Sequence, residues 1–188
     1  NGAGKTTTIR MITGILNPDE GDIFIDGKSI KSDSLEAKKN FGFVPDNPDM
    51  FLKLRGIEYL TFMADVYDVS EEKRKERIEN LTKKFDIYNE LNDQIQSYSH
   101  GMRQKIVICG ALLSEPKNWI LDEPMTGLDP KSSFDLKEMM KEHAKTGKAV
   151  FFSTHVLEVA EKLCDRVGII NKGKLVFVGT FEELKKEF

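Results

Sequence analysis

The sequence predicts an α/β fold with a mainly parallel sheet flanked by helices. The apolar runs at residues 119–121 and 149–152 are short and continuous, as in strands buried on both faces. Helical patterns separate these runs. Polar residues follow each run at once: Asp122 and Glu123 after the first, and Ser153, Thr154 and His155 after the second. Such sheets bind ligands beyond the carboxyl ends of their strands, so the two acids are candidates for holding a metal and activating a water. For residues 118–130 alone, the alternative is a buried strand with a polar exit turn.

The composition indicates one globular unit. At 188 residues the chain is long enough for one sizeable core, and 39% hydrophobic with 31% charged residues is typical of soluble globular proteins. The net charge of -3 argues against a nucleic-acid surface, which normally carries a basic excess. Cys109 and Cys164 have no zinc-site spacing and indicate no disulfide framework. The longest mostly apolar run is far shorter than the ~20 residues that span a bilayer.

The first residues, N-G-A-G-K-T-T, match the second half of the phosphate-binding loop G-x-x-x-x-G-K-[ST]. Gly2 and Gly4 let backbone N–H groups approach phosphate oxygens, and the helix that follows adds its positive N-terminal end. Lys5 can reach the outer phosphates, the Thr6 hydroxyl can ligate Mg²⁺, and Thr7 is placed for an inner phosphate. The alternative is an ordinary glycine-rich helix start. The first glycine of the motif would lie upstream of this sequence, so we expect a fragment that lacks the N-terminal strands.

The elements between the phosphate loop and the first buried run change in character along the chain. A helix is predicted to about Gly14, and residues 22–27 alternate like a half-buried strand that enters a turn. Residues 41–44 predict a short strand, followed by an acidic loop at 46–49. Residues 52–98 are helical in character and resemble an insertion between core strands. A helix that Ser70 can cap has an apolar stripe made by Ile78, Leu81 and Phe85, and its charge run is best explained as a solvated face.

Further helix starts and a hairpin are predicted in the second half. Ser99 opens one helix, and Asp129 followed by proline opens another. Residues 166–178 have the pattern of a hairpin. Thr180 and Glu183 form a capping box for a last short helix.

Five motifs stand in a fixed order along the chain: N-G-A-G-K-T-T, Y-S-H-G-M-R-Q-K, I-L-D-E-P, G-L-D-P and S-T-H. In this order and spacing, over essentially its whole length, the sequence resembles the ATP-binding subunit of ABC transporters. The resemblance implies the fold of a RecA-like P-loop NTPase with an inserted helical subdomain. Residues 1–51 and 101–188 would form the nucleotide-binding core of a single truncated domain, and residues 52–100 the helical subdomain.

The resemblance also implies roles for individual residues. Glu123 matches the catalytic glutamate that polarises the attacking water, and His155 matches the switch histidine that contacts the γ-phosphate. Ser99 and Gly101 would bind ATP held by the opposite subunit, and Asp129 would communicate across the dimer. The metal set would be Thr6, Asp122 and Asp46, for Mg²⁺. The ATP-binding set would be Asn1, Gly2, Gly4, Lys5, Thr6, Thr7, Ser99, Gly101 and Asp129.

Two positions depart from the family pattern. His100 stands where the most familiar signature, L-S-G-G-Q, has a glycine, and it is either a bystander or an extra phosphate contact. Asp46 stands where the family usually has a glutamine that contacts Mg²⁺ and water. Aspartate is shorter and charged, so its metal contact is either water-mediated or absent.

The function implied by the resemblance is an ATPase subunit that powers transport, with export favoured by the form of the motifs. Its partners would be transmembrane permease subunits and a second ATP-binding domain, at the cytoplasmic face of the membrane, and no nucleic acid is expected. Residues 50–55 are where the family places the contact with the permease; the alternative is the first turn of the helical insertion. A soluble ABC ATPase acting on ribosomes or DNA is the rival function. Without the start of its phosphate loop, we expect the isolated fragment to bind ATP poorly and to be inactive.

Overall fold

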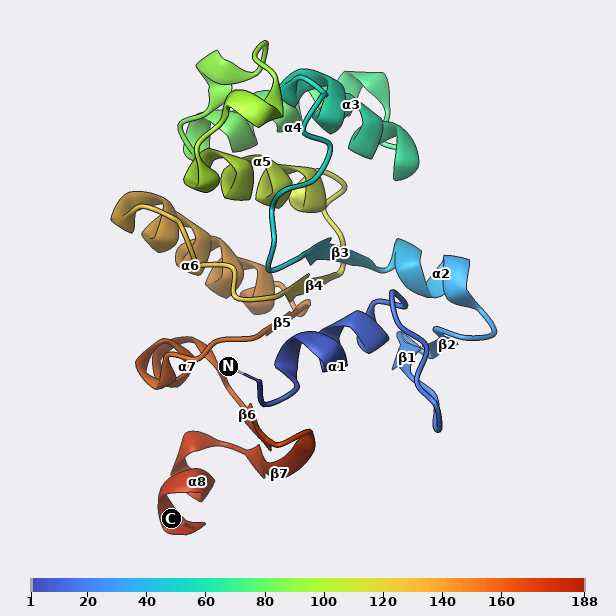
Figure 1. Ribbon diagram of the computed structural model, residues 1–188, viewed down its shortest axis with the longest axis vertical. Helices are drawn as coiled ribbons and strands as arrows, with labels where there is room; N and C mark the ends of the chain where they lie inside the picture. Colours follow the sequence, from blue (N-terminus) through green and yellow to red (C-terminus); the bar gives the residue numbers. More distant parts are fainter. Residues whose placement is uncertain (1, 188) are drawn as a thin grey trace.

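A three-stranded parallel sheet lies at the centre of the computed structural model, which describes residues 2–187 (Figure 1). Its strands are β3 (Phe41–Val44), β4 (Asn118–Leu121) and β5 (Ala149–Phe152), with β4 in the middle. Val44 pairs with Leu121, and Leu121 pairs with Phe152. All three strands therefore end at the same edge of the sheet, and the predicted strands at residues 41–44, 119–121 and 149–152 are confirmed.

The two faces of the sheet pack against different helices because side chains alternate along a strand. Ile120 belongs to a small core with Ile9 of α1 (Lys5–Ile12) and Ala37 of α2 (Ser34–Lys39). Trp119 and Leu121 belong to a larger core that includes α5 (His100–Leu112) and α6 (Pro130–Lys145). The sheet thus carries helices on both faces, as the α/β prediction requires.

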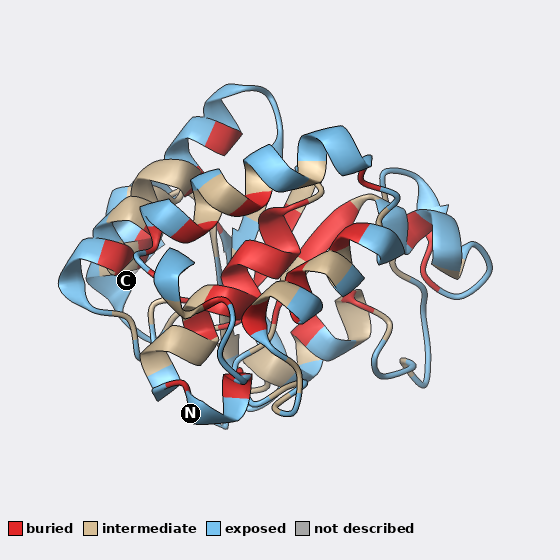
Figure 2. Ribbon diagram, turned by 90° about the horizontal axis from the view of Figure 1, so that it is seen from above, coloured by how far each residue is buried: buried red, intermediate tan, exposed pale blue. Residues whose placement is uncertain are grey.

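The helical segment forms one end of the molecule (Figure 1). It contains α3 (Gly56–Val66), α4 (Glu71–Lys84) and the 3₁₀ turns η1 (Tyr88–Glu90) and η2 (Ile95–Ser97). The predicted apolar stripe of α4 is confirmed, with Ile78 and Phe85 buried. Ser70 is at the N-terminus of α4, but its side chain makes no capping hydrogen bond. Because α5 packs against α3, α4 and β3, the helical segment and the sheet share one large core, and the buried positions gather centrally in Figure 2.

Two hairpins flank the sheet. The first pairs β1 (Phe24–Ile25) with β2 (Lys28–Ser29), and the second pairs β6 (Val167–Asn171) with β7 (Lys174–Gly179). The second was predicted and is confirmed. The strand predicted at residues 22–27 is only two residues long, and Phe24 is 63% exposed because β1 pairs with β2 alone and not with the central sheet.

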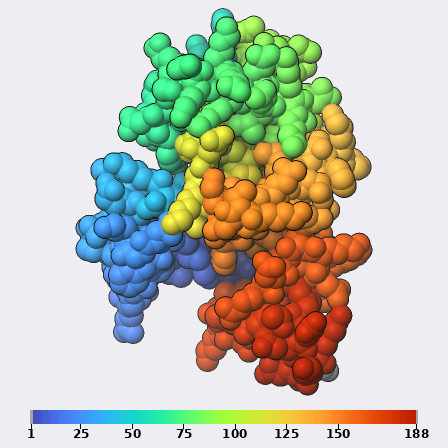
Figure 3. Space-filling view, turned by 180° about the vertical axis from the view of Figure 1, so that it is seen from behind, coloured from blue at the N-terminus to red at the C-terminus, as the bar shows by residue number. Residues whose placement is uncertain are grey.

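The end of the chain forms a lobe of its own. It contains β6, β7 and α8 (Phe181–Glu187), and α7 (Leu157–Leu163) connects it with β5. Thr180 and Glu183 exchange the two predicted capping-box hydrogen bonds at the start of α8. Figure 3 shows this lobe in red at one end of the molecule. No helix within residues 2–187 has both the length and the apolar content that crossing a membrane requires.

Candidate functional site

The phosphate loop turns into α1 through glycines in the left-handed region of the backbone. Gly2 has φ 82° and Gly4 has φ 109°, values that residues with a Cβ rarely adopt. Gly4 is the N-cap of α1, and its carbonyl accepts hydrogen bonds from the Thr8 backbone N–H at 2.9 Å and the Thr8 hydroxyl at 2.8 Å. Lys5 and Thr6 are half-buried, and Thr7 is exposed. Asn1, also expected in this loop, lies outside the described residues.

The two acids after β4 have very different surroundings. Asp122 is 1% exposed, and its N–H continues the parallel ladder by donating to the Val44 carbonyl at 2.8 Å. Ser153, directly after β5, donates its hydroxyl to Asp122 Oδ1 at 2.5 Å. The same Ser153 oxygen accepts the Glu123 N–H at 2.9 Å. One buried serine therefore fixes both the Asp122 side chain and the Glu123 backbone.

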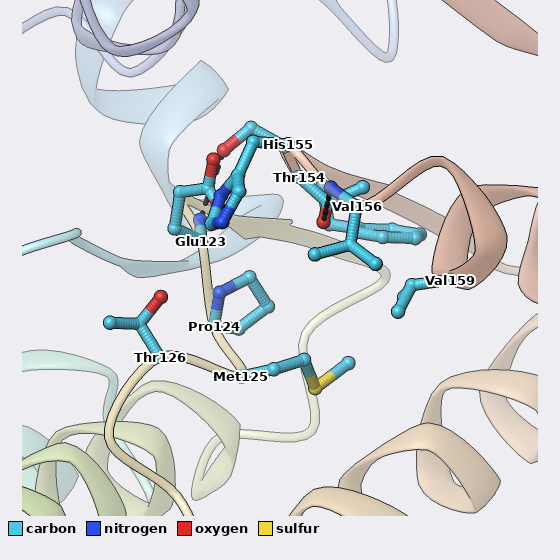
Figure 4. Close-up of a pocket in the computed structure, with 10 residues that line it drawn as sticks. Glu123, Pro124, Met125, Thr126, Thr154, His155, Val156 and Val159 are labelled. Carbon is cyan, nitrogen blue, oxygen red and sulfur yellow. Dashed lines mark hydrogen bonds and ion pairs between the residues drawn. The ribbon is translucent and has the colours of Figure 1, made fainter. Parts of the chain in front are cut away.

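Glu123 contacts both the loop after β5 and the start of α1, and Figure 4 shows it beside His155. Its Oε1 lies 3.7 Å from Lys5 Nζ, and its Oε2 lies 2.9 Å from His155 Nδ1. The Oε1 atom is buried and has no hydrogen-bond partner within residues 2–187, so its contact with Lys5 is purely ionic. The backbone of Glu123 has φ 47°, in the left-handed region that favours glycine. The side chain thus lies between Lys5 and His155, on a backbone conformation that is sparsely populated for a residue with a Cβ.

A pocket of about 210 Å³ opens beside this pair. Figure 4 shows His155 and Glu123 at one side of it, with Met125 and Thr126 from the loop after β4 and Val156 and Val159 from the segment after β5. The site therefore joins a polar edge, formed by Glu123 and His155, to a mostly apolar hollow.

Ser99, Gly101 and Asp129 form a second group at the starts of α5 and α6. The Ser99 hydroxyl oxygen caps α5 by accepting the Met102 N–H at 3.2 Å. A Cβ on Gly101 would lie 2.7 Å from the Gly127 carbonyl oxygen, so the two loops touch through glycines. A Cβ on Gly127 would in turn lie 2.5 Å from His100 Cδ2. His100 therefore packs on the loop that precedes Asp129.

Asp129 is held as a charged group. It accepts hydrogen bonds from the Ser132 N–H at 2.9 Å and the Ser132 hydroxyl at 2.7 Å, and it pairs with Lys105 Nζ at 2.7 Å. Lys105 foremost, and then Ser132, hold the pKa of the Asp129 carboxyl far below its usual range. Within residues 2–187, no hydrogen bond or ion pair joins Ser99, Gly101 or Asp129 to Lys5 or Glu123.

Asp46 faces a different partner from the one expected. Its carboxylate lies 3.9 Å from Arg10 Nη2 of α1, and its side chain is 40% exposed. No group of three or more His, Cys, Asp or Glu residues with metal-site geometry occurs within residues 2–187. A metal here would thus rely on a hydroxyl and on ligand phosphates beside the carboxylates.

Ser153 and Lys105 contact the expected site residues Asp122 and Asp129, and Arg103 contacts the acidic loop, but no role was predicted for any of the three. Arg103 binds Asp49, in the acidic loop, at 2.7 Å, and donates to the backbone carbonyls of Ile95 at 3.2 Å and Gln96 at 2.7 Å. Only Ser153 had a usable signal in the sequence, because it directly follows a buried parallel strand next to the strand that ends at Asp122.

Comparisons with known proteins agree on one family. A family model described as ABC transporter matches residues 1–126. The ABC-type transporter ATP-binding protein EcsA of Bacillus subtilis (strain 168) is 38% identical over 100% of this chain and 76% of its own length. The linearmycin resistance ATP-binding protein LnrL of the same bacterium is 35% identical over 98% of this chain, which spans only 59% of LnrL. A solved structure of an ATP binding subunit of an ABC transporter has a TM-score of 0.93 at 35% identity, over 100% of this chain and 78% of that one.

Proposed function

The chain belongs to the ABC transporter family of ATP-binding proteins, and on that premise we propose that it binds and hydrolyses ATP to power export through separate transmembrane subunits. The structural likeness also confirms the predicted α/β fold of a P-loop NTPase. No comparison favours the rival function on ribosomes or DNA.

The observation that carries the proposal is the convergence of Lys5 and His155 on the carboxylate of Glu123. Their contacts of 3.7 Å and 2.9 Å unite the phosphate loop with the ends of two adjacent parallel strands. Hydrolysis of a phosphoanhydride needs clamped phosphates, neutralised charge and an aligned water. In this proposal Gly2, Gly4 and the start of α1 bind the phosphates, with Thr7 beside them. Lys5 neutralises charge on the outer phosphates.

The oxygen atoms of Asp122 and Thr6 are suitable ligands for Mg²⁺. Asp122 is buried, and its Oδ2 makes no hydrogen bond within residues 2–187, so one carboxylate oxygen is free to ligate. The Thr6 hydroxyl at the start of α1 adds a second hard oxygen, and ATP phosphates would complete the set, which suits Mg²⁺. We assign Asp46 a water-mediated contact, because its carboxylate faces Arg10. When bound, Mg²⁺ neutralises charge that develops on the phosphates.

Glu123 is the proposed general base. Its carboxylate would take the proton of the attacking water, and His155, in contact with Oε2, would orient that carboxylate and the γ-phosphate. A general base of this kind is typically worth about 10²–10⁴-fold in rate. Ser153 fixes the backbone N–H of Glu123 and so limits where the carboxylate can move.

The second group, Ser99, Gly101 and Asp129, would serve ATP bound to another copy of the domain. Its separation from Lys5 and Glu123 supports this assignment, because one chain then supplies two halves of different sites. The N-terminus of α5 is a favourable position for an anion. Asp129, kept charged by Lys105, would report on the state of the neighbouring site.

An aromatic patch supports docking of a membrane partner next to the acidic loop. Phe51 is 45% exposed and Phe62 is 44% exposed, with ring centroids 5.5 Å apart. Phe51 also has φ 52°, an unfavourable backbone for an aromatic residue. An apolar helix of a permease fits such a patch. The protein would then work at the cytoplasmic face of the membrane, and the resistance function in the name of LnrL supports export.

The decisive experiment is Glu123→Gln in the full-length protein. The amide keeps the size of the side chain but cannot act as a base, so ATP binding should remain while turnover falls by about 10²–10⁴-fold. ATP affinity is measured by calorimetry and phosphate release by a steady-state assay. Glu142→Gln, an exposed substitution on α6, is the control and should leave both quantities unchanged. Normal turnover in Glu123→Gln would overturn the assignment.

A further inference from the structure

The turn of the β6–β7 hairpin lies against the phosphate loop, although the two are at opposite ends of the chain. The Gly173 N–H donates to the Ala3 carbonyl at 2.7 Å. A Cβ built on Gly4 would lie 3.3 Å from Gly173 Cα and 3.3 Å from Ile170 Cδ1. The hairpin therefore contacts the phosphate loop both by a hydrogen bond and by close packing.

The contact provides a hydrogen-bond donor for a backbone carbonyl of the phosphate loop. Such a loop directs its N–H groups to the phosphates of its ligand, and its carbonyls must find partners elsewhere. Gly173 supplies the partner of the Ala3 carbonyl, in the middle of the sequence G-A-G-K. Ile170 fills the space next to Gly4, whose φ of 109° depends on the absence of a side chain.

The geometry of the hairpin explains how it reaches the loop. Lys172 and Gly173 form a two-residue turn with φ 48° and 77°, between the paired residues Asn171 and Lys174. The N–H of the second turn residue is not used in the hairpin ladder and is free to donate outward. The register also shifts between Ile169 and Ile170, a bulge of the kind that redirects side chains near functional sites.

We propose that Gly173 and Ile170 are positioning residues for the phosphate loop, and that the hairpin holds the loop in its ATP-binding form before the nucleotide arrives. The proposal rests on the ATP-binding function proposed above. It adds a support that acts on nucleotide affinity and not on the chemical step, since neither residue forms a hydrogen bond or ion pair with Glu123 or His155 within residues 2–187.

The test compares two equivalent turns in the full-length protein. Asp26 and Gly27 form the turn of the β1–β2 hairpin with φ 48° and 75°, and neither Gly27 nor Gly173 has an atom within 4 Å of an added Cβ. The Gly27 N–H makes no hydrogen bond among residues 2–187. Alanine strains both turns equally, so Gly173→Ala and Gly27→Ala should lower the Tm alike. Alanine keeps the Gly173 N–H, but the strained turn should shift it away from the Ala3 carbonyl. Only Gly173→Ala should therefore weaken ATP binding, by about two- to tenfold, the factor for one backbone hydrogen bond.

The turnover rate separates positioning from general damage. Gly173→Ala should raise KM for ATP and leave kcat within about twofold, and Gly173→Asn, which tolerates the left-handed backbone, should restore KM. Ile170→Ala should act like Gly173→Ala, Ile170→Val should be milder, and Ile169→Ala on the same strand is the matched control.

Failure of the proposed function and failure of the positioning role give different results. If the unaltered protein does not bind ATP, the proposed function fails. If it binds ATP but Gly173→Ala and Gly27→Ala have the same affinity, or if only kcat falls, the positioning role fails alone. Should Gly173→Ala not fold, the comparison of Ile170→Ala with Ile169→Ala decides by the same criteria.

Discussion

Ser153→Ala tests whether one hydroxyl organises the acidic pair. Ser153 is 7% exposed, donates to Asp122 Oδ1 at 2.5 Å and accepts the Glu123 N–H at 2.9 Å. Alanine removes both bonds and leaves a buried carboxylate oxygen and a backbone N–H without partners. A bond to a charged group contributes about 1.5–3 kcal/mol and a neutral one about 1 kcal/mol, so the free energy of unfolding should fall by about 2–4 kcal/mol. For a chain of this size the Tm should fall by roughly 4–16 °C.

The control for this substitution is Ser114→Ala. The Ser114 hydroxyl is buried and has no hydrogen-bond partner within residues 2–187, so its removal should be neutral or slightly stabilising. Urea unfolding of both variants gives the two free energies under the same conditions. In the full-length protein, Ser153→Ala should also lower kcat by about 10–100-fold, because small displacements of catalytic groups are costly. Equal stability losses in the two variants, or unchanged kcat in Ser153→Ala, would refute the reasoning.

Three further predictions concern residues outside the acidic pair. Arg103→Ala should lower the free energy of unfolding by about 1–3 kcal/mol, because two backbone carbonyls lose a charged donor. A double-mutant cycle with Asp49→Ala should give a coupling energy of only about 0.2–1 kcal/mol, since the Asp49 side chain is 44% exposed. A coupling energy near zero would show that the ion pair does not stabilise the fold. Burial lowers the pKa of His143 below its ordinary 6.5, so the unfolded chain takes up that proton first and unfolding free energy should drop as the pH falls below about 6.5. His143→Phe should flatten this part of the pH profile, and an unchanged profile would contradict the assignment. Phe51→Glu should uncouple transport in the assembled transporter and spare basal ATPase; intact coupling would exclude docking at this patch.

Local signals in the sequence were sufficient for most of the fold. The strands at residues 41–44, 119–121 and 149–152 are apolar runs bounded by breakers, and each was predicted within a residue or two. Because parallel strands share a carboxyl edge, Glu123 and His155 meet there, and the resemblance had given both residues a role at one site.

Contacts that depend on the path of a loop were not predictable. The bond from Gly173 to Ala3 and the bridge from Arg103 to Asp49 join segments whose relative position is fixed only by tertiary packing. Propensity alone also predicted a capping bond for Ser70 that does not form. Such bonds are set by competition among neighbouring groups, which a local pattern does not encode.

The left-handed backbone of Glu123 sets fold stability and activity against each other. Glycine at this position would relax the backbone and stabilise the fold by about 1 kcal/mol, because only a residue with a Cβ carries this strain. It would also remove the proposed base. Directed evolution for heat resistance alone would therefore tend to discard the carboxylate, whereas selection for transport would retain it at the expense of the melting temperature.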